Sequence, residues 1–430
     1  MITEQEQQVL NLIDAHQDEI VEFLSKIIAY HTITPATGKS VGENKKAYRN
    51  LASLFSETLK KMEFTVDSWE VDAAQMENFK NSGIDNDRDM HGMPIVVGAL
   101  KSSGQGKSLI LNGHYDVVPA GLKENWAHDP FKGIIRDHNI YGRGTSDMKG
   151  GISAMLKAVQ FIQQAGIKLN GDLMVQLVPD EEETCMGTFA CCEKGYRADA
   201  ALVPEPTNMN VLIAMRGNCS GKITIKGRAG HAEMKQPHWK EGGAVNAISK
   251  SIKILKGIDE LRAEWHIHPG KQHKYLDPDS IQSTVIHGGD WSITYPEKME
   301  INFNANYIPT TQDLAAEIKD RINQVAREDD WLAENPPEIE IETMYGAEIK
   351  EDEPIALLGI NVLQDLGYQP GYSGMGSLTD AIHLINYARI PTISIGPADN
   401  SAHMANESVN IKELVDVTKA IALVIMRWTA

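Results

Sequence analysis

Short apolar runs that end in polar turns recur in the first and last parts of this 430-residue chain. Each run is nearly continuous instead of alternating, which is typical of strands buried on both faces of a sheet. Between two of the runs, residues 150–166 repeat apolar side chains at helical spacing and end at a glycine, which predicts a helix. Strands that alternate with helices indicate an α/β fold, a mostly parallel sheet covered by helices. The four runs are residues 107–119, 171–183, 198–207 and 390–404.

The middle of the chain follows a different pattern, in which strands with one apolar and one polar face accompany two longer helices. The order is strand, helix, strand, strand, helix, strand, which is the ferredoxin-like split motif. We therefore predict a small α+β domain of residues 216–345. We expect it to be inserted into a larger α/β domain built from residues 1–215 and 346–430.

Composition and charge exclude several classes of function and location. The net charge of −18 argues against a surface for nucleic acid or for an anionic membrane, since both attract basic patches. The first residues are polar and then amphipathic, which predicts a surface helix and not a signal peptide. No apolar run reaches membrane-spanning length. The four cysteines follow neither a disulfide nor a zinc-ribbon pattern, so we expect reduced thiols and a cytoplasmic location.

Histidine and carboxylate side chains stand near the ends of the predicted elements. His114 and Asp116 are two residues apart on a strand, so their side chains share a face. A nearby carboxylate is the usual group that holds the second nitrogen of a metal-binding imidazole. Asp147 lies in a glycine-rich approach to the helix of residues 150–166, where ordinary capping of the helix is the alternative. Taken alone, each of these signals is weak.

Further candidates follow the other apolar runs. Glu181 and Glu182 lie in an acidic run after the second, Glu205 follows the third, and His403 follows the fourth. Ligands of open α/β sheets collect beyond the carboxyl ends of the strands, and carboxylates gathered there repel one another unless a cation lies among them. Histidine and carboxylate ligands without cysteine suit zinc, cobalt or manganese, and a bridging carboxylate allows two ions. A solvated acidic loop without metal is the alternative.

Six motifs occur along the chain in the order GHYDVVPAG, IYGRGTSDMKGG, PDEEE, EPT, GRAGHAE and AHMANESV. With this set the chain resembles the dinuclear zinc amidohydrolases and metallopeptidases, the family of aminoacylase, carboxypeptidase G, acetylornithine deacetylase and succinyl-diaminopimelate desuccinylase. The resemblance covers nearly the whole chain. It implies a catalytic zinc-peptidase-like α/β domain, an inserted lid domain that forms a homodimer, and two zinc ions per subunit, with cobalt or manganese as possible substitutes.

The resemblance also implies a role for each matching residue. His114 corresponds to a terminal ligand of one metal, and Asp116 to the residue that orients it. Asp147 corresponds to the carboxylate that bridges both ions. Glu181 corresponds to the general base, and its neighbour Glu182 to a ligand of the second metal.

Three more roles come from the same resemblance. Glu205 corresponds to the acidic ligand of the first metal, and His403 completes the second. His231 of the lid corresponds to a histidine that reaches the active site of the partner subunit and stabilises a developing oxyanion. In this chemistry a water between the ions gives its proton to Glu181 and attacks an amide carbonyl.

The lid departs from the family pattern where substrate binds. The family usually has an arginine there that holds a substrate carboxylate, whereas this chain has Asn304 and Asn306. An amide cannot replace the guanidinium fork, so we expect a substrate without an α-carboxylate. A carboxylate held by another base, Arg216 or Arg228, is the alternative. The residues expected to contact substrate are Asn306, Gln282, Ser377, Thr379 and Arg216.

The leading hypothesis is a metal-dependent amidohydrolase that removes a formyl, acetyl or succinyl group from a small N-acylated amine or amino acid. A dipeptidase or carboxypeptidase of the same family and a deformylase of N-formyl aminopyrimidines are alternatives. A metal-binding homologue without catalysis belongs to a different class, and a general base beside a full ligand set argues against it. Residues 71–98 form a longer link than is usual in the family, and we expect a surface excursion, with a wall of the substrate pocket as the alternative.

Overall fold

The structure of the protein is a computed structural model that describes residues 1–36, 39–72, 88–398 and 401–430. Its contacts divide the chain into two compact units. The first unit contains Met1–Ile213, Ala347–Gly374 and Thr379–Ala430. The second unit contains Ala214–Gly346 and Met375–Leu378.

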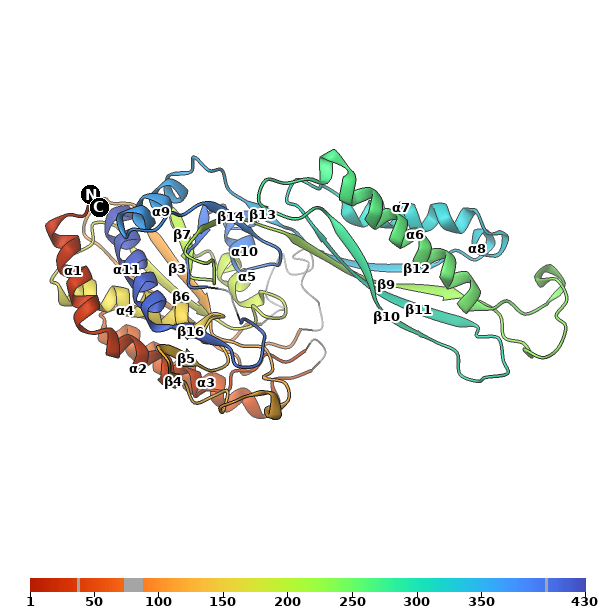
Figure 1. Cartoon of the computed structure of the whole chain (residues 1–430), viewed down its shortest axis with the longest axis horizontal. Helices are drawn as coiled ribbons and strands as arrows, with labels where there is room; N and C mark the ends of the chain where they lie inside the picture. The colour runs from red at the N-terminus through yellow and green to blue at the C-terminus, as the bar shows by residue number, and fades with distance from the viewer. Residues whose placement is uncertain (37–38, 73–87, 399–400) are drawn as a thin grey trace. The chain divides into compact units, whose positions relative to one another are not determined.

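The first unit is built around a mixed sheet, of which β3, β6, β7, β13 and β14 are labelled in Figure 1. Among the described residues, the strand order along this sheet is β1-β2-β6-β3-β7-β15-β8-β13, with β14 paired to β8. The strands are β1 (Thr65–Trp69), β2 (Ile95–Leu100), β3 (Leu109–His114), β6 (Leu173–Val178), β7 (Ala200–Val203), β8 (Val211–Met215), β13 (Ala347–Glu348), β14 (Tyr372–Met375) and β15 (Thr392–Ser394). A separate small sheet contains β4 (Ile134–Arg136), β5 (Asn139–Tyr141) and β16 (Ser408–Asn410).

Helices surround these strands. They are α1 (Glu4–Ala15), α2 (Gln17–Ile28), α3 (Lys45–Lys61), α4 (Lys149–Gln164), α5 (Met186–Glu193), α9 (Pro354–Asp365), α10 (Ala381–Asn386) and α11 (Ile411–Trp428), with short 3₁₀ turns η1 (Gly42–Asn44) and η4 (Lys123–Asn125). The predicted helix of residues 150–166 corresponds to α4, which packs against β3, α2 and α11. Among the described helices, none has both the length and the apolar character needed to span a membrane.

The centre of the main sheet is parallel. Strand β3 lies between β6 and β7 and runs parallel to both, and β15 is parallel to β7. The pairs β1–β2 and β2–β6 are antiparallel. The expected α/β fold with a mostly parallel sheet is therefore confirmed. Because parallel neighbours end at the same edge, the segments that follow β3, β6, β7 and β15 leave the sheet side by side.

The start of α4 lies very close to the end of β7. A Cβ atom added to Gly151 would lie 2.2 Å from the carbonyl oxygen of Pro204, which is closer than any real contact. A glycine is therefore required for this approach. It brings the residues before α4 beside the residues that follow β7.

The second unit has the order β9 (Gly217–Lys226), α6 (Ala247–Ile267), β10 (Ser280–Gly288), β11 (Lys298–Tyr307), α7 (Leu314–Arg327), α8 (Asp330–Glu334) and β12 (Glu338–Met344), with 3₁₀ turns η5 (Trp239–Glu241) and η6 (Pro269–Lys271). Its antiparallel sheet has the order β10-β11-β9-β12, which is the ferredoxin-like arrangement. The core contains apolar residues of α6, α7 and the sheet, including Ile254, Ile318 and Phe303. The second, lid-like unit thus has one helix-covered sheet face and one polar face.

The link of residues 71–98 differs from the expected surface excursion. Residues 73–87 of this segment lie outside the described part of the chain. The residues that follow are largely buried, with Arg88, Met90 and Met93 at most 3% exposed. The expectation is therefore wrong for residues 88–98, because this end of the link packs into the first unit and continues into β2.

Candidate metal centre and general base

The strand ends of the first unit bring the predicted ligands together. His114 is the last residue of β3, Glu182 follows β6, and Glu205 follows β7. Asp147 precedes α4, and His403 follows β15. These elements are neighbours in the sheet or pack against it, which explains how residues far apart in sequence meet at one edge.

Two groups of potential ligand atoms share Asp147. The ligand atoms of His114, Asp147 and Glu205 lie within 4.8 Å of one another, and so do those of Asp147, Glu182 and His403. Asp147 presents Oδ1 at 3.1 Å from Nε2 of His114 and Oδ2 at 3.3 Å from Nε2 of His403. A carboxylate with one oxygen toward each histidine has the arrangement that a bridging ligand requires.

Asp116 supports both a histidine and the acidic loop. The carbonyl oxygen of Asp116 lies 3.1 Å from Nδ1 of His114, which directs Nε2 toward Asp147. The carboxylate of Asp116 accepts the backbone N–H groups of Glu181 at 3.2 Å and Glu182 at 3.3 Å. Asp116 therefore holds the two glutamates of the acidic loop as well as the imidazole.

The carboxylates of this centre repel one another. Burial, followed by neighbouring acidic groups, raises the pKa of Glu181 and of Glu205 well above the ordinary value. Burial and the charge of Asp147 raise the pKa of Glu182 to about 7. Oε1 of Glu205 is buried and lacks a hydrogen-bond partner within the described residues. Such a cluster is stable when a cation lies among the carboxylates, so the donor set fits divalent metal ions such as zinc.

The two histidines carry the complementary charge. Burial disfavours a charged His114, but Glu181, Asp116 and Asp147 raise its pKa well above the ordinary value. Hydrogen bonds to Asp147 and Glu182 raise the pKa of His403 to about 10. The same carboxylates that attract these protons would attract a metal ion in their place.

Sequence reasoning missed several residues that shape this centre. Asp180, the first acid of the run after the second apolar segment, is fully buried and forms an ion pair with Arg88. The carboxylate of Glu407 is also fully buried and accepts hydrogen bonds from the loop that carries Asp147. Asp380 is buried as well, and burial raises its pKa to about 8. The acidic residue four positions after His403 was a usable signal for Glu407, whereas Arg88 lies 92 residues from its partner.

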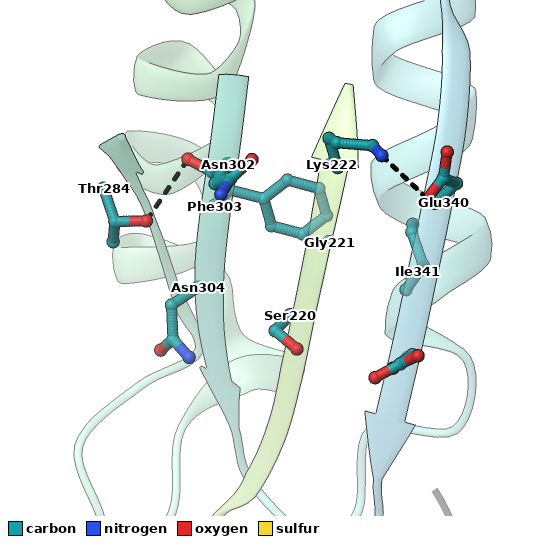
Figure 2. A pocket seen from close by; sticks show the side chains of 10 residues that line it. Ser220, Gly221, Lys222, Thr284, Asn302, Phe303, Asn304, Glu340 and Ile341 are labelled. Atoms are coloured by element: carbon teal, nitrogen blue, oxygen red, sulfur yellow. Dashed lines mark hydrogen bonds and ion pairs between the residues drawn. The ribbon is translucent and has the colours of Figure 1, made fainter. Parts of the chain in front are cut away.

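The predicted substrate residues of the lid occupy its open sheet face. Along β11, Asn302, Asn304 and Asn306 alternate with buried apolar residues. In the sheet register Asn304 lies opposite Gln282 on one neighbouring strand and opposite Ser220 on the other. Figure 2 shows this face, which carries a shallow groove of about 410 Å³ lined by amide, hydroxyl and charged side chains.

The two arginines proposed as carboxylate ligands both bond to the lid's own backbone. Nη2 of Arg216 donates to the carbonyl oxygens of Pro278 at 2.7 Å and Asn306 at 2.9 Å. Nη1 of Arg228 donates to the carbonyl oxygens of Trp239 and Gly243. Both arginines thus have backbone partners, but Nε of Arg216 is buried without a hydrogen-bond partner among the described residues, and a role in substrate binding stays a prediction.

The remaining predicted contacts have different environments. Ser377 is exposed, whereas Thr379 is buried and its hydroxyl accepts the N–H of Ala381 at the start of α10. His231 is exposed, and its Nδ1 accepts the N–H of Glu233 at 3.3 Å. This bond places the ring proton of the neutral imidazole on Nε2, which makes that nitrogen a hydrogen-bond donor.

Comparisons with known proteins identify relatives along the whole chain. The profile described as peptidase family M20/M25/M40 matches residues 110–427. The N-formyl-4-amino-5-aminomethyl-2-methylpyrimidine deformylase of Bacillus subtilis (strain 168) is 30% identical over 454 residues, covering 98% of both chains. The deformylase of the same name from Halalkalibacterium halodurans is 28% identical over 442 residues, covering 98% of this chain and 97% of the relative. A tripeptidase structure from Staphylococcus aureus is similar with a TM-score of 0.73 at 18% identity, covering 96% of this chain and 99% of that one.

Proposed function

The chain belongs to peptidase family M20/M25/M40, and we propose that it is a zinc-dependent deformylase of N-formylated aminopyrimidines. The observation that carries this proposal is the pair of ligand groups that share Asp147 beside Glu181. The names of the relatives from Bacillus subtilis and Halalkalibacterium halodurans supply the substrate class. Release of formate from the formylated pyrimidine by zinc-loaded protein tests the proposal, and its absence under those conditions would refute it.

Two zinc ions fit the donor set, because histidine and carboxylate ligands suit zinc as they do cobalt or manganese. His114 and Glu205 would hold one ion, Glu182 and His403 the other, and Asp147 both. When bound, such ions lower the pKa of a water molecule and polarise a carbonyl group.

Glu181 is the proposed general base and acid. Its Oε2 lies 3.7 Å from Nε2 of His114, so the carboxylate faces the ligand cluster. The N–H bond to Asp116 positions its backbone. Glu181 takes a proton from the attacking water and delivers it to the departing amine nitrogen. The reaction converts the formamide and water into formate and a free amine.

His231 is the proposed donor to the oxyanion that develops on the formyl oxygen. The family resemblance assigns this role to the partner subunit's His231. The bond from Glu233 supports it, because the protonated Nε2 can donate to an anionic oxygen.

We infer a homodimer that forms through the lid. Strand β10 is one of the two edge strands of the lid sheet and pairs on one side with β11. Ile252 of α6 is 60% exposed and Ile286 of β10 is 47% exposed, and α6 packs on β10. An exposed sheet edge with apolar side chains beside it favours pairing with a second copy. Four free, buried cysteines support a reducing, cytoplasmic location.

The variant Ile252→Asp should convert the dimer into monomers, because it places a charge in the paired apolar surface. Sedimentation velocity of the variant and the parent protein measures this change. A parent protein that sediments as a monomer at micromolar concentration would contradict the inferred dimer.

The amide side chains of the lid support a substrate without a carboxylate. The formylated aminopyrimidine named for the relatives has an amino group beside a ring nitrogen and no carboxylate. Carboxamides form paired hydrogen bonds with such a donor and acceptor edge. Asn306 and Gln282 are therefore proposed to form hydrogen bonds with the pyrimidine, in place of an arginine that would bind a carboxylate.

The variant Asn306→Arg should lower kcat/KM for the formylated pyrimidine by about tenfold, the loss expected for one paired hydrogen-bond contact. It should raise the relative rate for N-formyl amino acids, because the guanidinium supplies the missing carboxylate ligand. Steady-state kinetics with both substrates measure the change, and Asn302→Arg on the same strand face is the matched control. Equal effects of the two variants would contradict a specific role of Asn306.

A further inference from the structure

Glu407 is a buried carboxylate that joins the two loops carrying Asp147 and His403. It lies four residues after His403 and directly before β16, and it is 0% exposed. Strand β16 pairs with β5, and the ladder continues as the N–H of Gly142 donates to the carbonyl oxygen of Glu407 at 2.9 Å. This pairing places the side chain of Glu407 against the loop that leads from β5 to α4.

Each carboxylate oxygen of Glu407 accepts two hydrogen bonds. Oε2 accepts Nη1 of Arg143 at 2.6 Å and the backbone N–H of Gly144 at 2.9 Å. Oε1 accepts the backbone N–H groups of Ser146 at 2.9 Å and Asp147 at 3.2 Å. Four donors therefore converge on one side chain, and three of them are consecutive or nearly consecutive amides of the Asp147 loop.

The charge of Glu407 is compensated within the protein. The guanidinium of Arg143 is 2% exposed, forms the ion pair with Glu407 and also donates to the carbonyl oxygen of Pro119 at 3.4 Å. Its carbon lies 5.4 Å from the centre of the Trp126 ring. Both oxygens of Glu407 accept hydrogen bonds, whereas Nε of Arg143 is buried without a hydrogen-bond partner among the described residues. Removal of one partner of such a buried ion pair leaves an uncompensated charge. Glu407 is therefore held in place and belongs to neither ligand group.

The two ligand groups depend on Glu407 unequally. His114 ends the buried strand β3, and Glu205 follows the buried strand β7. His403 lies in a loop, and its side chain is 56% exposed. Asp147 must direct one oxygen to each histidine, so a shift of its backbone alters both distances. The group with His403 has the weaker support from the sheet and the stronger dependence on Glu407.

We propose that Glu407 is a positioning residue that locks the Asp147 loop to the His403 loop and thereby sets the affinity of the Asp147, Glu182 and His403 site for its metal ion. This inference rests on the proposed function in one respect, namely that the two ligand groups bind metal. Glu407 itself contacts neither substrate nor metal, and it acts through the backbone of Asp147 and the course of the His403 loop.

The variant Glu407→Gln tests this role. Whichever way the amide is turned, its NH₂ group faces two of the four donors, so two hydrogen bonds are lost. We expect the affinity for one of two zinc equivalents to fall by about 10–100-fold, as for other residues that support metal ligands. Titration with a competing chelator measures both equivalents. In metal-free protein, amide hydrogen exchange at Gly144, Ser146 and Asp147 should be faster than in the parent.

Glu6→Gln is the matched control. Glu6 is also buried and also pairs with an arginine, Arg427, but it lies in α1, where its carboxylate accepts hydrogen bonds from Thr3 and Arg427. The Glu6→Gln variant should bind both zinc equivalents with the parent affinities, even if its melting temperature falls. In Glu407→Gln, KM should stay close to the parent value while kcat falls at limiting zinc and recovers with excess zinc.

Arg143→Lys provides a second variant if Glu407→Gln does not fold. It keeps a positive charge beside Glu407 and leaves the three backbone amides bonded, so it should show a smaller loss of the same zinc equivalent. Parent-like zinc affinity in both folded variants, or equal loss of both equivalents, would overturn the proposal. If the parent protein itself bound no zinc, the proposed function would fail instead, so the two failures are distinguishable.

Discussion

The variant Glu181→Gln should lower kcat by about 10²–10⁴-fold while both metal sites stay filled. A glutamine has almost the same shape, and the N–H bond from residue 181 to Asp116 is retained, so the ligand geometry survives. What is lost is the group proposed to take the proton from water, because an amide is not a base at neutral pH. Formate release measures kcat, and metal analysis of the purified variant counts the ions.

The neighbouring Glu183 provides the control for this experiment. It lies two residues from Glu181 in the same acidic run, but its side chain is exposed. Glu183→Gln should keep kcat within about twofold of the parent, as expected for a surface change away from the centre. Substantial activity of a metal-loaded Glu181→Gln protein would show that another group moves the proton.

The variant Asp147→Asn should lose metal and activity together. One oxygen of Asp147 faces His114 and the other faces His403, so the amide NH₂ must replace one of them. The variant also loses the negative charge that both ions would share. We expect at least about a thousandfold loss of kcat/KM, corresponding to several kcal/mol of transition-state stabilisation. Excess zinc should restore little of it.

Metal content separates this outcome from simple misfolding. Asp147→Asn should retain the circular dichroism spectrum of the metal-free parent protein, because the α4 helix and the strands of the sheet do not depend on this carboxylate. A folded Asp147→Asn protein that still binds two tight zinc equivalents would exclude Asp147 as the shared ligand.

The fold was predictable where the pattern of apolar residues in a short segment indicates which side chains are buried. The apolar runs correspond to β3, β6, β7 and β15, and parallel pairing places their ends at one edge. The alternation along β9 predicted an amphipathic strand, and the lid sheet has one apolar and one polar face. These features follow from side-chain periodicity, which is a local property of the chain.

The ligand groups were predictable for a related reason. His114 ends a strand and Glu182, Glu205 and His403 each follow one, so topology gathers them once the sheet order is known. Their roles as metal ligands stay a prediction, as does the role of Glu181.

Residues that act through long-range pairs were not predictable. Asp180 reads as one of four acids in a polar run, yet it is buried because Arg88 neutralises it. Arg216 reads as a free base for substrate, yet its guanidinium holds the backbone of the lid. In both cases the partner is more than sixty residues away in the sequence, so no local pattern reports the pairing.

The selectivity ratio for two formamides tests the central claim most directly. With zinc-loaded protein, kcat/KM should be measured for N-formyl-4-amino-5-aminomethyl-2-methylpyrimidine and for an N-formyl α-amino acid of similar size, with formate release as the common signal. The proposed function predicts a ratio of at least about 100 in favour of the pyrimidine, because paired amide contacts favour one substrate and an unmatched carboxylate disfavours the other. A ratio near one, or a preference for the amino acid, would contradict it.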